Sequence, residues 1–149
     1  MIAFELPGTD GQVWTRDRLH GQGEVAVHFI KKSCPVNAGA MTYFKRLAAL
    51  VPGRYVGVFD GCRDTYERYR QAHGIEFPCI LDANRDLVAA YGVLRSPTLI
   101  LFRNADEVMR WESFSEATLA AMADQLAAFA GSQESELSFA GAPMREKFG

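Results

Sequence analysis

Residues 25–37 read Val-Ala-Val-His-Phe-Ile-Lys-Lys-Ser-Cys-Pro-Val-Asn, and this stretch decides the fold. Its first six residues form a mostly apolar run rich in β-branched side chains, which is typical of a strand buried on both faces in a parallel sheet. Cys34 and Pro35 follow, and apolar residues then recur at helical spacing to about Val51. The stretch therefore predicts a strand, a cysteine-containing loop and a helix in direct succession.

The same alternation of strand and helix patterns continues on both sides of this stretch. Strands alternating with helices indicate parallel pairing through right-handed crossovers, and a late pair of strands across a short turn adds antiparallel pairing. An Asp-Gly pair between two short extended runs near the N-terminus predicts a hairpin. The fold class is therefore α/β, a three-layer α/β/α sandwich around one mixed central sheet with an N-terminal β-hairpin. The further predicted strands cover residues 55–60, 98–102 and 108–111, and the last predicted helix runs from Ser115 through Phe129.

Length and composition limit the classes of function. The chain has 149 residues, enough for one domain with its own core. We expect that domain to span residues 1–131 and to be followed by a poorly ordered polar tail over residues 132–149. The net charge of −2 provides no basic field for nucleic acid, and no apolar run approaches the ~18 residues of a membrane span.

The N-terminus has neither a basic region nor a long apolar region of the kind that signal peptides contain. We therefore expect a cytoplasmic protein as the chain is written. If a signal peptide has been removed, the expected location is periplasmic or otherwise extracytoplasmic. The sequence does not predict an oligomeric state.

Three cysteines occur, at positions 34, 62 and 79. Their odd number and wide spacing do not form a disulfide framework, and the short paired spacings of a zinc site are missing. We therefore expect no bound metal and no cofactor. Cys79 lies in an apolar run and is predicted to be part of the core.

Cys34 is the candidate nucleophile. It lies between a predicted buried strand and a helix start, where backbone N–H groups are unpaired and the helix dipole stabilises a thiolate. Lys31 and Lys32 add positive charge nearby. The alternative is a structural cysteine buried at a helix start, and the residues around it leave both interpretations open.

The second candidate feature is the Ser96-Pro97 pair directly before a predicted central strand. Proline is unusual there because it cannot donate a hydrogen bond to the sheet. A cis peptide bond would make a tight turn against the edge of the sheet where ligands bind. The alternative is an ordinary trans turn.

Taken in order, these features resemble the thioredoxin superfamily, and most closely its redoxin branch of TlpA/ResA-like and AhpC/TSA-like proteins. The resemblance covers about Phe4 to Gly131. It implies a thioredoxin fold, Cys34 as an exposed nucleophilic thiol, and Pro97 as a cis-proline packed against that thiol. The matching motifs are Asp10-Gly11, Ser33-Cys34-Pro35, Phe77-Pro78, Leu81-Asp82, Tyr91-Gly92-Val93 and Ser96-Pro97-Thr98.

Two departures from the family pattern bear on the chemistry. The redox motif of the family is Cys-x-x-Cys after an aromatic residue, but Asn37 occupies the position of the second cysteine and Ser33 that of the aromatic residue. No disulfide can therefore close within this motif. A peroxiredoxin has Pro seven residues and Thr three residues before its reactive cysteine, where this chain has Val27 and Lys31.

Two further residues are candidates for supporting roles. His28 lies six residues before Cys34, at a position that often holds a buried polar side chain in thioredoxin-like proteins. Its imidazole is a candidate base for the thiol proton, or else a histidine hydrogen-bonded within the strand layer. Cys62 follows a neighbouring strand and is a candidate resolving thiol, or else a loop cysteine without a partner.

These observations favour a thiol–disulfide oxidoreductase that acts on protein or small-molecule thiols and disulfides through Cys34. One alternative is a peroxiredoxin-like peroxidase, which would convert Cys34 to a sulfenic acid. Another is a redox-inactive binding or scaffold module, since a fold alone does not fix a function.

Overall fold

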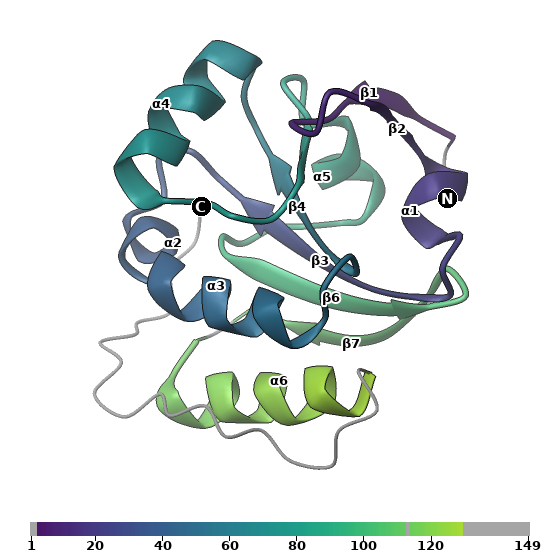
Figure 1. The fold of residues 1–149 in the computed structure, drawn as a ribbon, viewed down its shortest axis with the longest axis vertical. Coiled ribbons are helices and arrows are strands. Elements are labelled where there is room, and N and C mark those ends of the chain that lie inside the picture. Colours follow the sequence, from purple (N-terminus) through teal and green to yellow (C-terminus); the bar gives the residue numbers. More distant parts are fainter. Residues whose placement is uncertain (1–2, 113, 130–149) are drawn as a thin grey trace.

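The computed structural model describes residues 3–112 and 114–129, in which helices cover both faces of a five-stranded sheet (Figure 1). The strand order across that sheet is β5-β4-β3-β6-β7. The strands are β1 (Glu5–Pro7), β2 (Val13–Thr15), β3 (Glu24–Ile30), β4 (Tyr55–Phe59), β5 (Cys79–Leu81), β6 (Thr98–Arg103) and β7 (Asp106–Trp111). The helices are α1 (Arg16–His20), α2 (Pro35–Gly39), α3 (Met41–Leu50), α4 (Arg63–His73), α5 (Asp86–Ala90) and α6 (Glu116–Phe129).

The central sheet is mixed, as the sequence predicts. Strand β4 runs parallel to both β3 and β5, whereas β6 runs antiparallel to β3 and β7. Strand β3 lies in the middle, and every residue from Val25 to Ile30 is buried, because helices or other elements cover it from both sides. The predicted N-terminal hairpin is also confirmed, with β1 antiparallel to β2.

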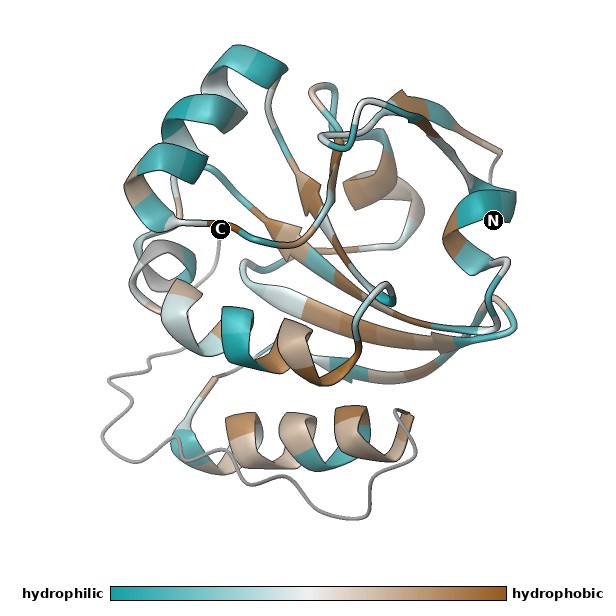
Figure 2. Ribbon diagram, viewed as in Figure 1, coloured by the Kyte–Doolittle hydropathy of each residue, from teal (hydrophilic) through white to brown (hydrophobic). Residues whose placement is uncertain are grey.

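Two apolar clusters fill the spaces between the sheet and the layers on its two faces. Helices α3, α4 and α6 pack on one face around residues such as Phe44, Phe59 and Leu119. The hairpin, α1 and α5 cover the other face around Trp14, Phe29 and Leu87. The hydropathy of the elements agrees with this layering: the central strands are mostly apolar, and the outer helix α4 is largely hydrophilic (Figure 2). The three-layer sandwich is therefore present as expected.

The helix expected from Pro35 to about Val51 is instead two helices. Ala40 separates α2 from α3 with φ −99° and ψ 1°, and its carbonyl accepts the N–H groups of both Tyr43 and Phe44. Gly39 immediately before it is a poor helix former. Cys34 therefore precedes a helix of five residues, whose dipole is smaller than that of the long helix predicted from the sequence.

No helix in the described ranges is both long and apolar enough to cross a bilayer. The predicted tail over residues 132–149 lies outside the described residues.

Asp82 fixes the start of α5, and its removal should destabilise the protein. Its buried carboxylate accepts the N–H groups of Asp86, Leu87 and Val88 at 2.8, 3.0 and 3.2 Å. We expect Asp82→Ala to lower the free energy of unfolding by about 1–2 kcal/mol, measured by urea denaturation. Asn84→Ala, at an exposed position in the same turn, should change it by less than about 0.5 kcal/mol. Equal effects of the two variants would contradict the capping role.

Candidate active site

Cys34 lies at the carboxyl end of the central strand β3. A turn over residues 31–33 links the strand to the thiol, with the N–H of Cys34 donating to the carbonyl of Lys31 at 3.0 Å. Pro35 then begins α2. The residue is only 4% exposed, and its Sγ–H donates to the backbone carbonyl of Ser96 at 3.2 Å. The expectation of an exposed thiol is therefore wrong, because Cys34 is buried with its polar partner in the loop that precedes β6.

The peptide bond between Ser96 and Pro97 is cis, as predicted. Antiparallel pairing of β3 with β6 places Thr98 opposite Phe29, which brings this loop beside the turn that leads to Cys34. The hydroxyl of Ser96 accepts the N–H of Lys31 at 3.2 Å. The two features that the sequence singled out are therefore in direct contact.

Asn37 and His28 form a buried pair beneath this contact. Both residues are 0% exposed. The Nε2–H of His28 donates to Oδ1 of Asn37 at 3.0 Å, and the hydroxyl of Tyr55 donates to Nδ1 of His28 at 3.0 Å. The amide Nδ2 of Asn37 extends toward Oγ of Ser96 at 3.5 Å. A series of hydrogen-bonded side chains thus runs from Tyr55 in the core to the loop that contains the cis peptide bond.

The surroundings of His28 keep its ring neutral. Burial lowers the pKa of this imidazole to about 3, and the hydrogen bond to Asn37 offsets that effect only in part. Both ring nitrogens are already engaged by Asn37 and Tyr55, so the geometry does not aim the ring at Cys34 Sγ. The arrangement matches the alternative of a histidine hydrogen-bonded within the fold better than it matches a base for the thiol.

Asp60 is a site residue that the sequence analysis did not identify. Its carboxylate, 3% exposed, accepts the N–H of Lys32 at 2.7 Å and forms an ion pair with Arg85 at 2.9 Å. The Nζ of Lys32 also donates to the Asp60 carbonyl at 3.1 Å. Asp60 therefore holds the turn before Cys34 against the end of β4. The signal in the sequence is a carboxylate at the end of the apolar strand predicted over residues 55–60, and the structure places it directly after β4.

The other two cysteines have different surroundings. Cys62 is exposed before α4, and hydrogen bonds from the side chain and N–H of Thr65 lower the pKa of its thiol. Burial raises the pKa of the Cys79 thiol to about 12, which fits the predicted core position. All three cysteines are free, and Cys62 Sγ contacts Thr65 at 3.4 Å whereas Cys34 Sγ contacts Ser96. Cys62 and Cys34 therefore form no disulfide and have separate hydrogen-bond partners.

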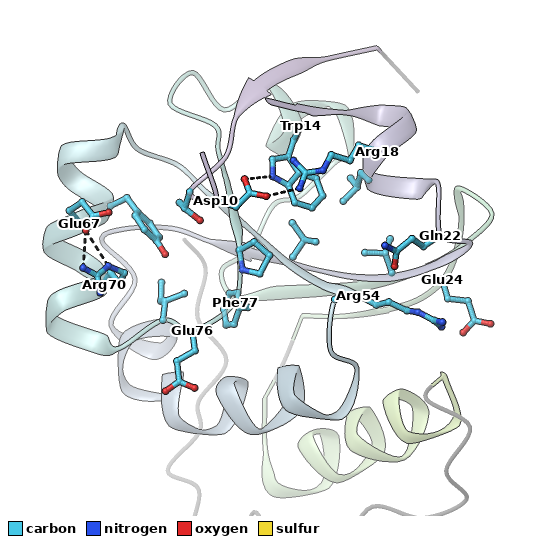
Figure 3. A pocket seen from close by; sticks show the side chains of 18 residues that line it. Asp10, Trp14, Arg18, Gln22, Glu24, Arg54, Glu67, Arg70, Glu76 and Phe77 are labelled. Atoms are coloured by element: carbon cyan, nitrogen blue, oxygen red, sulfur yellow. Dashed lines mark hydrogen bonds and ion pairs between the residues drawn. The ribbon is translucent and has the colours of Figure 1, made fainter. Parts of the chain in front are cut away.

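A separate cavity of about 560 Å³ opens between the N-terminal hairpin, the start of β3 and α4 (Figure 3). In this cavity the Asp10 carboxylate accepts the Nε1–H of Trp14 and forms an ion pair with Arg18. The Arg18 guanidinium lies 3.8 Å from the centroid of the Trp14 ring. None of the candidate residues named above lines this cavity. Within residues 3–112 and 114–129, no group of three or more His, Cys, Asp or Glu side chains could hold a metal ion.

The sequence model of the AhpC/TSA family matches residues 1–118. The chain belongs to the AhpC/TSA family. By family and fold it is thus a redoxin of the thiol–disulfide oxidoreductase or peroxiredoxin kind. No curated protein sequence matches the chain.

Solved structures similar to this AhpC/TSA-family protein establish the thioredoxin fold. A secreted disulfide oxidoreductase of Mycobacterium tuberculosis, homologous to DsbE of E. coli, is 17% identical with a TM-score of 0.69 over 82% of this chain and 95% of its own. The exposed lipoprotein thioredoxin Etrx1 of Streptococcus pneumoniae is 20% identical, with a TM-score of 0.66 over 84% and 98%. The bacterioferritin comigratory protein of Xanthomonas campestris, studied for alkyl peroxide reduction, is 18% identical, with a TM-score of 0.69 over 85% and 92%.

The neutral His28 ring predicts that stability of this AhpC/TSA-family protein falls in mild acid. The unfolded ring takes up a proton near pH 6.5, whereas the folded ring does so only near pH 3. Between pH 6.5 and pH 3 protons therefore bind preferentially to the unfolded chain. The contribution of the neutral His28 ring to the free energy of unfolding is complete above pH 6.5 and is lost as the pH falls. We expect His28 to account for about 2 kcal/mol of the loss between pH 7 and pH 5.

Urea denaturation of the wild type and of His28→Gln at both pH values measures this effect, because the difference between the two proteins should narrow at pH 5. Nitrogen NMR of the wild-type ring provides an independent check, and should show the neutral Nε2–H tautomer down to about pH 4.5. A ring that titrates near pH 6.5 in the folded protein would contradict the buried, neutral assignment.

Proposed function

We propose that this AhpC/TSA-family protein is a thiol–disulfide oxidoreductase that uses Cys34 as its single active-site thiol. The observation that carries the proposal is the 3.2 Å contact of Cys34 Sγ with the carbonyl of Ser96, the residue directly before cis-Pro97. A substrate sulfur that approaches Cys34 meets this loop at the same time. Asn37 in place of a second cysteine limits the chemistry of this loop to one thiol.

The reaction is a two-step exchange. The Cys34 thiolate attacks one sulfur of a disulfide RS–SR, so that a Cys34–SR bond forms, the S–S bond breaks, and RS⁻ leaves and takes up a proton. An external thiol then attacks the substrate sulfur of the mixed disulfide and releases the Cys34 thiolate. The net result transfers one RS group between thiols, and no further oxidant or reductant is needed. In the alternative second step, the loop of Cys62 moves and Cys62 attacks Cys34 Sγ, so that a Cys34–Cys62 disulfide forms and the second RS⁻ leaves and takes up a proton; an external thiol then reduces that disulfide.

His28, Ser96 and Pro97 have positioning roles in this proposal. Ser96 and Pro97 fix the loop that receives the substrate, and His28 holds Asn37, whose amide extends to Ser96. The ring of His28 is fully buried and has both nitrogens engaged. We therefore assign it no proton transfer with Cys34.

Peroxide reduction is the second candidate function, favoured by the family match and by the similarity to the Xanthomonas campestris protein. The residues around Cys34 support it less well, because Lys31 and Val27 occupy the positions where peroxiredoxins have Thr and Pro. We therefore place disulfide exchange first.

The test compares wild type, Cys34→Ser and Cys62→Ser in the exchange of hydroxyethyl disulfide with dithiothreitol. We expect Cys34→Ser to fall to the rate of the uncatalysed exchange, because the nucleophile is removed, and Cys62→Ser to retain turnover. Intact mass after treatment with the disulfide alone should show an adduct in Cys62→Ser that the double variant Cys34→Ser/Cys62→Ser lacks, because the exposed Cys62 thiol reacts on its own.

Other outcomes separate the alternatives. Loss of the adduct in wild type, with retention in Cys62→Ser, would identify Cys62 as the resolving thiol. Rapid peroxide consumption with a trapped sulfenate, and no exchange with disulfides, would favour the peroxidase. Turnover by Cys34→Ser equal to that of wild type would refute the role of Cys34, and the absence of any reactivity would favour a binding module.

A further inference from the structure

A second cavity, of about 220 Å³, opens beside the cis-proline loop. The ends of β3 and β4, helix α5 and the chain leading to Ser96 form its walls. Its body is apolar, with Phe29, Ile30, Val88 and Val93 among the lining residues. Since the volume is below the range of about 300–1,000 Å³ typical of sites for drug-sized ligands, the space suits a small organic group.

The charged groups on the walls favour an anion. Three cations line the cavity, Lys31, Arg85 and Arg95, against a single carboxylate, that of Asp60. Asp60 is already paired with Arg85, and Arg95 is paired with Glu112, which is not part of the wall.

Of the three cations in the wall, Lys31 is the one that these two ion pairs do not include. Its ammonium group has no ion pair or hydrogen bond with any other residue that the structure describes. The walls therefore present one uncompensated positive charge next to an apolar space.

Ser96 connects this cavity to the candidate nucleophile. It lines the cavity, its carbonyl accepts the Cys34 thiol at 3.2 Å, and its hydroxyl accepts the N–H of Lys31 at 3.2 Å. A molecule in the cavity therefore lies next to the residue that holds Cys34, with the cation of Lys31 on the same wall. Because Cys34 is only 4% exposed, a small reagent reaches it more readily than a folded protein does.

We propose that the substrate is a low-molecular-weight disulfide with an apolar body and a carboxylate, and that Lys31 determines this specificity. The inference rests on the function proposed above. The apolar part of the substrate occupies the cavity, its carboxylate pairs with Lys31, and one of its sulfurs faces Cys34. The Cys34 thiolate forms a bond to that sulfur, and the other half of the substrate leaves as a thiolate that takes up a proton.

The experiment compares two aromatic disulfides, the anionic dithiobis(nitrobenzoate) and the smaller, neutral dithiodipyridine. Both are reacted with the full chain carrying Cys62→Ser, because the exposed Cys62 thiol would otherwise react as well. Stopped-flow absorbance at low salt gives the rate constant of Cys34 with each reagent. The ratio of the two rate constants measures charge selectivity independently of any change in the reactivity of the thiol itself.

We expect Lys31→Gln to lower that ratio about fivefold, the effect of one partly screened charge pair, and Lys31→Arg to preserve it. Lys45→Gln is the matched control, since it removes the same charge from α3 and does not line this cavity. Its ratio should stay within about twofold of that of the parent protein.

Two results would overturn these conclusions separately. An equal ratio in the parent, Lys31→Gln and Lys45→Gln would refute the carboxylate specificity but leave Cys34 as the exchanging thiol. Reaction of the protein carrying both Cys34→Ser and Cys62→Ser at the rate of the parent would refute the proposed function itself.

Discussion

The candidate site depends on the hydrogen bonds of a single residue, Ser96. Its carbonyl accepts the thiol of Cys34, and its hydroxyl accepts the N–H of Lys31 and, at a longer distance, the amide of Asn37. Cys34 and Lys31 lie in the loop that follows β3, and Asn37 lies in helix α2. Because β3 and β6 are paired through six residues on each strand, backbone pairing sets where Ser96 meets the thiol. The position of Cys34 therefore depends more on the sheet than on the short helix α2 that follows it.

Burial of the polar His28 ring is unfavourable by itself, but the hydrogen bonds of the ring make the site more rigid. An imidazole in the middle of the sheet would be strongly destabilising without partners, since burying an unpaired polar group costs several kcal/mol. His28 meets Tyr55 and Asn37 at 3.0 Å each, and its ring packs against Phe44 at a centroid distance of 4.2 Å. A fully paired polar network in an apolar core favours one arrangement over its neighbours. The network ends at Ser96, so that the rigidity of the core extends to the loop beside the thiol.

Local patterns in the sequence were sufficient for the architecture, whereas the contact between Cys34 and the Ser96-Pro97 loop was expected from the resemblance to the thioredoxin superfamily. The apolar run before Cys34, the Asp-Gly hairpin and the Ser-Pro pair each have a local physical cause, and each appears in the structure. The partners of Asp60 and the walls of the cavity near Lys31 could not be predicted, because they join segments that only the tertiary fold brings together. The break at Ala40 is not evident from the sequence because the apolar positions that indicate the helix, such as Met41, Phe44 and Leu47, all lie after it.

In the sequence Asn37 stands out only as the replacement of a second cysteine, whereas in the structure it is a hydrogen-bond partner of His28. Its Oδ1 satisfies the buried Nε2–H of His28, which a cysteine sulfur would do only weakly, and an unsatisfied buried donor costs about 1–3 kcal/mol. The histidine in β3 and the asparagine in α2 therefore require each other. In the proposed exchange this loop has no second thiol, so a mixed disulfide on Cys34 would last until another thiol attacks it. In that proposal the attached half of the substrate would lie in the apolar cavity beside Ser96, whose wall includes Lys31.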